Sequence, residues 1–263
     1  MAEPRIVFVM YHELELPGRP LARSEPGYVR YVLSAADFQT QMRWLNQAGW
    51  EGVSVGKALS FARDRWVAIT FDDGCETDRV VAAEILQELG FSATFYITTG
   101  FLSRPGFLSA AQLRELIKMG FEIGCHSMTH SYLTGLDDVG LQREILQAKQ
   151  QLEQVIGLPV EHFSCPGGIY DRRVAYTARG AGYRSVATSR IRANGTSTDP
   201  FALGRVAVMR GTELSRFGSI CQARGLWQLR TSHAVRAAAR KVLGNSFYDR
   251  LRAVALGSRG PQL

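Results

Sequence analysis

The sequence predicts an α/β domain built on a parallel β-sheet. Apolar strand-like runs alternate with helical patterns along most of the 263 residues, and the connections between them are mostly short. Polar motifs follow several predicted strands directly, and functional side chains gather at that end of the strands in parallel barrels. A chain of this length can bury the core of one large domain of this class.

Residues 5–12 (RIVFVMYH) form the first predicted strand, a short run of β-branched and aromatic residues. Residues 14–33 are rich in Pro, Gly, Arg and Glu, which predicts a long loop of the kind that can act as a lid. Ser34 is a typical N-cap for a helix over residues 35–48. Residues 53–55 predict a short strand.

Residues 66–71 (WVAITF) predict a strong second strand that ends at a pair of aspartates. The spacing of apolar residues predicts a helix over 77–89, with Gly90 as its stop. A strand over 92–97 and a helix over 109–119 continue the alternation.

Residues 121–124 predict a strand that leads to a histidine, and residues 137–156 a long amphipathic helix. Residues 161–165 predict a strand that opens onto a Pro-Gly-Gly loop, and residues 171–180 a helix. The last predicted strands cover residues 183–188 and 205–208.

The composition, with 46% hydrophobic and 21% charged residues, is that of a soluble globular protein. No run of eighteen or more apolar residues occurs, so no transmembrane helix is expected. The N-terminus lacks the pattern of a signal peptide, which predicts a cytoplasmic protein. The four cysteines have no C-x-x-C spacing and indicate neither a disulfide framework nor a zinc ribbon.

The net charge of +7 is concentrated near the C-terminus. From Arg205 onward there are eleven Lys and Arg against two Asp and Glu, a balance of +9, which leaves −2 for the remainder. Residues 228–256 predict two basic amphipathic helices, which either pack on the barrel or lie on an anionic membrane surface. No nucleic-acid-binding module is present, and no nucleic-acid partner is expected. We therefore predict a catalytic domain over residues 1–210 and a basic helical extension over 211–263.

Asp72 and Asp73 form an unusual pair at the end of the predicted strand over 66–71. A single aspartate there could simply cap a turn or the next helix. Two adjacent carboxylates before Gly74 are harder to explain by capping alone.

His126 and His130 stand four residues apart, so a helical turn would place both rings on one face. Alone, each could be a structural histidine. One Asp and two neutral imidazoles, however, are a common ligand set for a catalytic divalent metal that keeps a position open for water. The other Asp is then free to accept a proton, which predicts metal-assisted hydrolysis. The loop of Pro166, Gly167 and Gly168 can bring backbone close to a substrate.

These segments resemble the motifs of the polysaccharide deacetylase family, carbohydrate esterase family four, and the resemblance extends over roughly residues 5–210. It implies a distorted (β/α) barrel in which Asp72 is the catalytic base and Asp73, His126 and His130 hold the metal. Zinc is the usual ion of the family, and cobalt, nickel or iron serves in some members.

The opening segment Met10-Tyr11-His12 also resembles the start of many members, and we expect Tyr11 to contribute to substrate binding. The chain departs from the family pattern in two places. Ser164 stands where the family has an Arg that orients the catalytic Asp. The family's late L-x-H motif, which supplies a general acid, has no clear match. His12 is the best alternative acid, and the other interpretations are a structural His12 and a proton delivered by metal-bound water.

The sequence therefore predicts a cytoplasmic, metal-dependent deacylase that removes an N-acetyl group from an amino sugar. A lipid-linked or nucleotide-linked precursor in exopolysaccharide or envelope synthesis is the expected substrate, and the basic helices suggest contact with the inner face of the membrane. The alternatives are hydrolysis of a small-molecule amide or an O-acetyl ester at the same site, and an inactive carbohydrate-binding or assembly protein.

Overall fold

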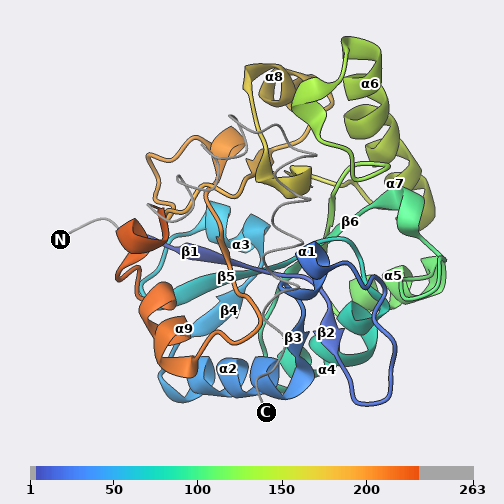
Figure 1. Ribbon diagram of the computed structural model, residues 1–263. Coiled ribbons are helices and arrows are strands. Elements are labelled where there is room, and N and C mark those ends of the chain that lie inside the picture. Colours follow the sequence, from blue (N-terminus) through green and yellow to red (C-terminus); the bar gives the residue numbers. More distant parts are fainter. Residues whose placement is uncertain (1–3, 231–263) are drawn as a thin grey trace.

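A computed structural model describes residues 4–230, which form a curved parallel sheet with helices packed around it (Figure 1). The strand order is β10-β1-β5-β6-β7-β8-β9, with β4 paired to β5, and these pairs are all parallel. The strands are β1 (Val7–Tyr11), β4 (Glu51–Val53), β5 (Trp66–Phe71), β6 (Thr94–Ile97), β7 (Glu122–Cys125), β8 (His162–Ser164), β9 (Ser185–Ala187) and β10 (Val206–Ala207). This arrangement confirms the predicted α/β barrel.

The helices follow the strands in the βα order expected of parallel pairing. They are α2 (Ala35–Gln47), α3 (Val55–Ser60), α4 (Ala83–Glu88), α5 (Ala110–Lys118), α6 (Asp138–Gln142), α7 (Ala148–Ile156), α8 (Arg172–Gly180) and α9 (Leu214–Cys221). Two π-helical segments, Asp78–Ala82 and Arg143–Gln147, precede α4 and join α6 to α7. Single 3-10 turns occur at Thr99–Phe101, Leu133–Gly135, Pro166–Gly168 and Pro200–Ala202.

The edge strands of the sheet are β9 and β10, and the barrel closes at a seam between them. No regular strand pair within the described residues bridges this seam, but two isolated bridges lie along it, Ala187 beside Leu203 and Ile6 beside Asn194. The first bridge is parallel and the second antiparallel. The seam is therefore built by the irregular segment 194–203, which leads directly into β10.

Two apolar clusters follow from the alternation of side chains along the strands. The larger lies between the sheet and the helices and includes Val7, Val9 and Tyr11 of β1. The smaller includes Phe8 of β1 together with Ala58 of α3, so α3 packs against the other face of the sheet, inside the curve.

Most predicted elements are confirmed within one or two residues at each end, and Ser34 caps α2 by accepting a hydrogen bond from the Asp37 N–H at 3.0 Å. The short strand predicted over 53–55 is displaced. It covers Glu51–Val53, because Ser54 accepts a hydrogen bond from the Lys57 N–H and starts α3. Helices α3 and α9 were not predicted.

Residues 14–33 are not a single open loop. They contain a short two-stranded sheet, β2 (Leu14–Glu15) with β3 (Leu33–Ser34), and a one-turn helix, α1 (Pro26–Val29). The buried Glu13 holds this segment in place: its carboxylate accepts hydrogen bonds from the Ala22 N–H, at 2.9 and 3.1 Å, and from the Tyr28 hydroxyl, at 2.8 Å.

Helix α9 lies beside α2 (Figure 1), where the rings of Phe217 and Trp44 meet edge to face with centroids 6.1 Å apart. The first part of the predicted C-terminal extension thus packs on the barrel. The boundary at residue 210 stays a prediction, and the basic helices predicted over 228–256 lie, apart from residues 228–230, outside the described residues.

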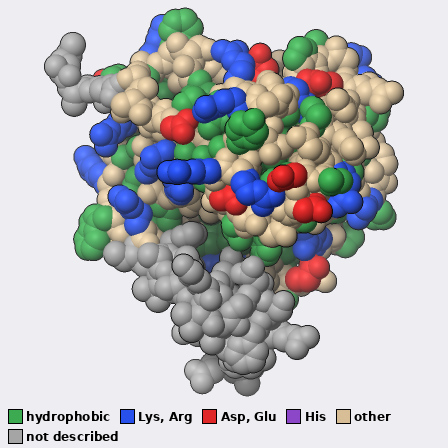
Figure 2. Space-filling model, turned by 90° about the horizontal axis from the view of Figure 1, so that it is seen from above, with side chains coloured by type: hydrophobic (Ala, Val, Ile, Leu, Met, Phe, Trp, Pro, Cys, Tyr) green, Lys and Arg blue, Asp and Glu red, His purple; other side chains and the backbone are tan. Residues whose placement is uncertain are grey.

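None of the helices in residues 4–230 combines the length and the apolar character that a membrane span requires. Figure 2 shows Lys and Arg side chains spread over one face of the molecule with Asp and Glu side chains between them.

Candidate active site and metal centre

A cavity of about 470 Å³ lies where the strands end, and the candidate catalytic side chains line it. Strands β1 and β5 pair along their length, from Val7 beside Val67 to Tyr11 beside Phe71. The residues that follow, His12 and Asp72, therefore leave the sheet next to each other, and both line the cavity.

Asp73, His126 and His130 converge on one point. One donor atom from each lies within 4.8 Å of the other two. Oδ1 of Asp73 is 3.6 Å from Nε2 of His126 and 3.3 Å from Nε2 of His130. This buried oxygen has no hydrogen-bond partner among the described residues. Such an orphaned oxygen facing two imidazole nitrogens fits a divalent cation.

The ring of His126 is oriented by the backbone. Its Nδ1 is 2.9 Å from the carbonyl oxygen of Ser164. Because a carbonyl can only accept, Nδ1 carries the proton and the lone pair of Nε2 faces Asp73. Burial lowers the pKa of His126 to about 4, although Asp72 acts in the opposite direction. The imidazole is therefore neutral at pH 7, the state that a metal ligand requires.

The segment from His126 to His130 is a tight turn, and the helical geometry we considered is wrong. Ser127 has φ of +66° and His130 φ of +63°, and the Ser127 hydroxyl accepts a hydrogen bond from the His130 N–H at 3.0 Å. Asp73 also has a positive φ, +79°. Left-handed backbone is costly for residues other than glycine, and its concentration here indicates a geometry imposed by function.

Glu144, which sequence reasoning missed, anchors this turn. Its side chain is fully buried on the π-helical segment Arg143–Gln147. The carboxylate accepts hydrogen bonds from the N–H groups of Met128, at 3.0 Å, and Thr129, at 2.8 Å, and from the Thr129 hydroxyl, at 2.8 Å. π-helical segments are frequent at functional sites, and this one places a carboxylate behind the turn that carries both histidines.

The Arg that the family motif would place at position 164 is replaced by Arg205. Its guanidinium makes a two-pronged contact with Asp72, at 2.7 Å to Oδ1 and 2.8 Å to Oδ2. It also donates to the Ser164 hydroxyl at 2.7 Å. Burial by itself raises the pKa of Asp72, but Arg205, followed by His126, outweighs burial and holds this pKa well below its ordinary value. Asp72 is therefore a carboxylate at neutral pH.

His12 lines the cavity beside these groups and packs against Tyr31, with ring centroids 4.9 Å apart and the ring planes tilted by 34°. Its buried Nδ1 has no hydrogen-bond partner among the described residues. Burial lowers the pKa of His12, and the carboxylates of Asp73 and Asp72 oppose this shift.

The other expected binding residues separate into two groups. Gly167 and Gly168 line the cavity, whereas Pro166 is buried behind them. Tyr11, expected to bind substrate, instead lies in the core: it is 1% exposed and donates a hydrogen bond to Oε1 of Gln41 at 2.8 Å. Its position in β1 explains the difference, because side chains alternate and Tyr11 points toward the helices.

The segment held by Glu13 forms one wall of the cavity, with Arg23, Tyr28 and Tyr31 among its lining residues. Its hydrogen bonds to Glu13 make it a fixed wall in this structure. Closure of this segment over a substrate stays a prediction.

Residues 62–186 match the sequence model of the polysaccharide deacetylase family. Over these residues, a little under half of the chain, the sequence is similar to that family. The matched segment contains Asp72, Asp73, His126 and His130, whereas His12 and Arg205 lie outside it.

Two curated relatives have names from this family. The chain is 26% identical over 193 residues to the YxkH protein of Bacillus subtilis, covering 71% of this chain and 69% of that protein. It is 33% identical over 124 residues to the peptidoglycan-N-acetylglucosamine deacetylase of Bacillus cereus, covering 47% of this chain and 56% of that enzyme. The chain thus spans little more than half of the second relative.

Two solved structures share the barrel. The Streptococcus pyogenes deacetylase PplD, in complex with acetate, superposes with a TM-score of 0.74 at 19% identity and covers 84% of this chain and 99% of its own. IcaB from Ammonifex degensii gives a TM-score of 0.72 at 23% identity and covers 84% and 98%. At these identities the likeness concerns the fold, and it confirms the predicted deacetylase-type barrel.

Proposed function

We propose that the chain is a metal-dependent hydrolase that removes an N-acetyl group from an amino sugar in a glycan or a glycan precursor. The observation that carries this proposal is the convergence of Asp73, His126 and His130, with the Asp72 carboxylate fixed beside them. The similarity to the family supports it, as do relatives named peptidoglycan-N-acetylglucosamine deacetylase and chitooligosaccharide deacetylase.

Asp73, His126 and His130 would hold the ion, since they offer one oxygen and two nitrogens from buried or half-buried side chains. When bound, the ion supplies Lewis-acid polarisation of the acetyl carbonyl and lowers the pKa of a water molecule. Zinc suits this ligand set, and cobalt, nickel or iron are the alternatives.

The roles of the remaining residues follow from their positions. Asp72, which Arg205 keeps ionised, accepts the proton of the attacking water. His12, which lines the same cavity as these carboxylates, gives a proton to the departing amine nitrogen. Gly167 and Gly168 let the backbone come close to the acetyl group because they carry no side chain. A cytoplasmic location, a lipid-linked or nucleotide-linked carrier and a membrane contact stay predictions.

Acetate release by the metal-loaded protein tests the proposal. The panel holds chitooligosaccharides, nucleotide-linked and lipid-linked N-acetyl sugars, a small N-acetyl amide and an O-acetyl ester. The control is Asp72→Asn with its metal content verified. We expect turnover of an N-acetyl sugar that is lost in the variant. Turnover of the ester or the simple amide alone would favour the alternative hydrolases, and no turnover with metal retained would favour a binding protein.

A further inference from the structure

A second cavity, of about 330 Å³, lies at the opposite end of the barrel from Asp72. It is bounded by α3, by the starts of β1 and β8, and by the seam segment 194–203. Phe8 lines this cavity, whereas Met10, two residues later along the same strand, lines the candidate active site. Likewise His162 lines this cavity, whereas Ser164, two residues later, contacts Arg205. The two cavities thus occupy opposite ends of the same strands. Its volume is within the range of about 300–1,000 Å³ that ligand sites occupy.

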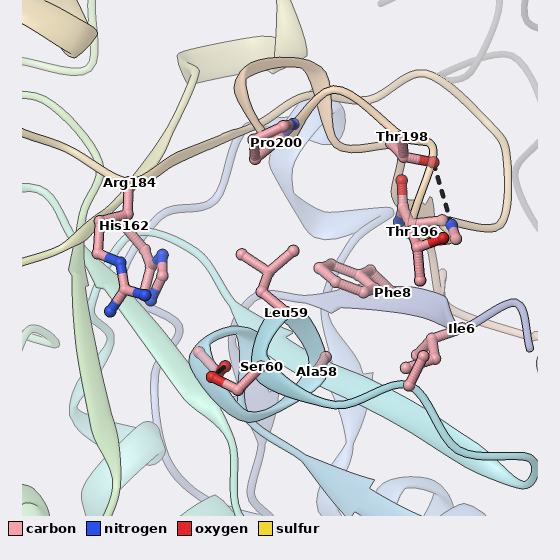
Figure 3. Close-up of a pocket in the computed structure, with 14 residues that line it drawn as sticks. Ile6, Phe8, Ala58, Leu59, Ser60, His162, Arg184, Thr196, Thr198 and Pro200 are labelled. Atoms are coloured by element: carbon pink, nitrogen blue, oxygen red, sulfur yellow. Dashed lines mark hydrogen bonds between the residues drawn. The ribbon is translucent and has the colours of Figure 1, made fainter.

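One part of the wall is apolar. Figure 3 shows Leu59 and Phe8 side by side near the centre of the view, with Ala58 below them and Ile6 at the lower right. Leu59 is 40% exposed, so a large apolar side chain on this wall is open to a ligand. This surface suits the body of a small apolar molecule.

The other end of the wall carries a single formal charge. Arg184 and His162 lie side by side there (Figure 3). Burial lowers the pKa of His162, so its ring is neutral at pH 7. Its Nδ1 is 2.8 Å from the Ser185 hydroxyl, while its buried Nε2 has no hydrogen-bond partner among the described residues. The lining residues include no Asp or Glu, so Arg184 is the only formally charged side chain among them.

Two carboxylates lie near this end without lining the cavity. Glu122 Oε2 is 3.7 Å from Nε2 of His162, and this carboxylate accepts hydrogen bonds from the Gly56 N–H and the Ser54 hydroxyl at the start of α3. Glu161 is 2.9 Å from Nη1 of Arg184, but the two side chains are 45% and 65% exposed. An exposed pair of this kind is weak, and a guanidinium has further donors for a second anion.

We propose that this cavity is a second binding site, which takes a small amphipathic carboxylate. The apolar body of the ligand lies against Phe8 and Leu59, and its carboxylate pairs with Arg184 beside His162. A cation would find no carboxylate on the lining, and a wholly polar solute would leave the apolar wall uncovered. This site is independent of the proposed deacetylase reaction.

Isothermal titration calorimetry of the full chain with 3-phenylpropionate tests the proposal. Two reference ligands separate the contributions of the apolar body and the charge to binding. 3-Phenylpropanamide has the same apolar body without the charge, and acetate has the charge without the apolar body. We expect saturable binding of one equivalent of the acid, and at least about tenfold weaker binding of each reference ligand.

Four exposed positions provide the variants. Arg184→Gln should weaken binding of the acid about tenfold or more, because it removes the charge. Glu161→Gln should leave it unchanged or tighten it, because it removes the competing carboxylate. Arg173→Gln is the control: Arg173 is likewise an exposed, ion-paired arginine, on α8, and does not line the cavity. Leu59→Ser should weaken the acid and the amide alike.

Binding at the candidate metal centre is excluded by repeating the titration with Asp73→Asn, which should retain the affinity. The proposal is overturned if no saturable binding occurs, if Arg184→Gln and Arg173→Gln behave alike, or if Asp73→Asn abolishes binding.

Discussion

The guanidinium of Arg205 holds both carboxylate oxygens of Asp72, although 133 positions separate the two residues in the sequence. Both side chains are almost completely buried, at 1% and 2% exposure. The contact joins the strand that ends at the candidate base to the last strand of the barrel. It explains how the site keeps an oriented, ionised aspartate without the arginine of the family motif.

Replacement of Arg205 by methionine should therefore impair the function of Asp72 as the catalytic base. We expect kcat/KM to fall about a hundredfold or more, in the range of general-base contributions. Without the guanidinium, burial raises the pKa of Asp72, so the acidic limb of the pH profile should move to higher pH. The unpaired buried carboxylate should also cost about 3–5 kcal/mol of stability. Steady-state kinetics across pH and urea denaturation measure the two effects.

A relocated arginine provides the matching test. Ser164 already contacts both Arg205 and Asp72, so Ser164→Arg in an Arg205→Ala background returns the guanidinium to the position of the family motif. We expect part of the lost activity to return and the pH profile to move back. An Arg205→Met variant with an unchanged pH profile would contradict the role we assign to this residue.

Glu144→Gln should lower the affinity for the metal ion without changing any of the residues proposed to bind it. The amide keeps the shape of the side chain but loses the negative charge that holds the turn of residues 126–130. Residues that orient ligands typically contribute about 10–100-fold to metal affinity, and we expect a loss in that range by competitive chelator titration. Glu153→Gln, on α7 and bound to the Val160 N–H, is the control and should retain full affinity.

The metal-free protein should lose stability as the pH falls from 7 to 5. The pKa of His126 is lowered to about 4 from an ordinary 6.5, so the unfolded chain takes up a proton first. The stabilisation is complete above the unfolded pKa and is lost progressively between pH 6.5 and 4, with about 2 kcal/mol lost by pH 5. Urea denaturation at both pH values, compared with His126→Gln, isolates this contribution, because the variant should show a shallower dependence.

His12→Asn should separate amide from ester substrates. An amine is a poor leaving group and needs a proton, whereas p-nitrophenolate leaves without one. We expect hydrolysis of the amide to slow by about a hundredfold and that of p-nitrophenyl acetate to change much less. Equal losses on both substrates would assign His12 a structural role beside Tyr31.

Tyr11→Phe should affect stability but not turnover. The change removes the hydroxyl that bonds to Gln41 and leaves the aromatic packing with Phe38 and Phe71 intact. The expected cost is about 1 kcal/mol in the free energy of unfolding. Unchanged kcat and KM would place Tyr11 outside the substrate site.

The barrel strands were predictable because most are short runs rich in aromatic, β-branched and other apolar residues, followed by a turn residue or a polar motif. Helix α9 was not predictable from its local pattern. Gly218 interrupts it, and glycine disfavours helix. In the fold, an added Cβ at this position would lie 2.9 Å from the ring of Trp44, so the glycine permits close packing against α2.

The four side chains of the Asp72-Asp73 and His126–His130 segments could be found from spacing and residue type alone. The roles of Arg205 and Glu144 could not, because they depend on contacts between segments that are distant in the sequence. The inward or outward direction of Tyr11 likewise depended on the strand register. Sequence patterns thus located the chemical groups, and tertiary structure supplied their supports.

The seam of the barrel has a consequence for how the protein matures. Asp72 becomes fully paired only when β10 docks beside β1, and β10 follows nearly all the catalytic segments along the chain. During synthesis, a nascent chain that has emerged only as far as residue 186 would carry every residue of the family match but not the guanidinium that keeps the base ionised. Acquisition of activity is thereby coupled to synthesis of the chain past Arg205, and products truncated before this residue should remain inert.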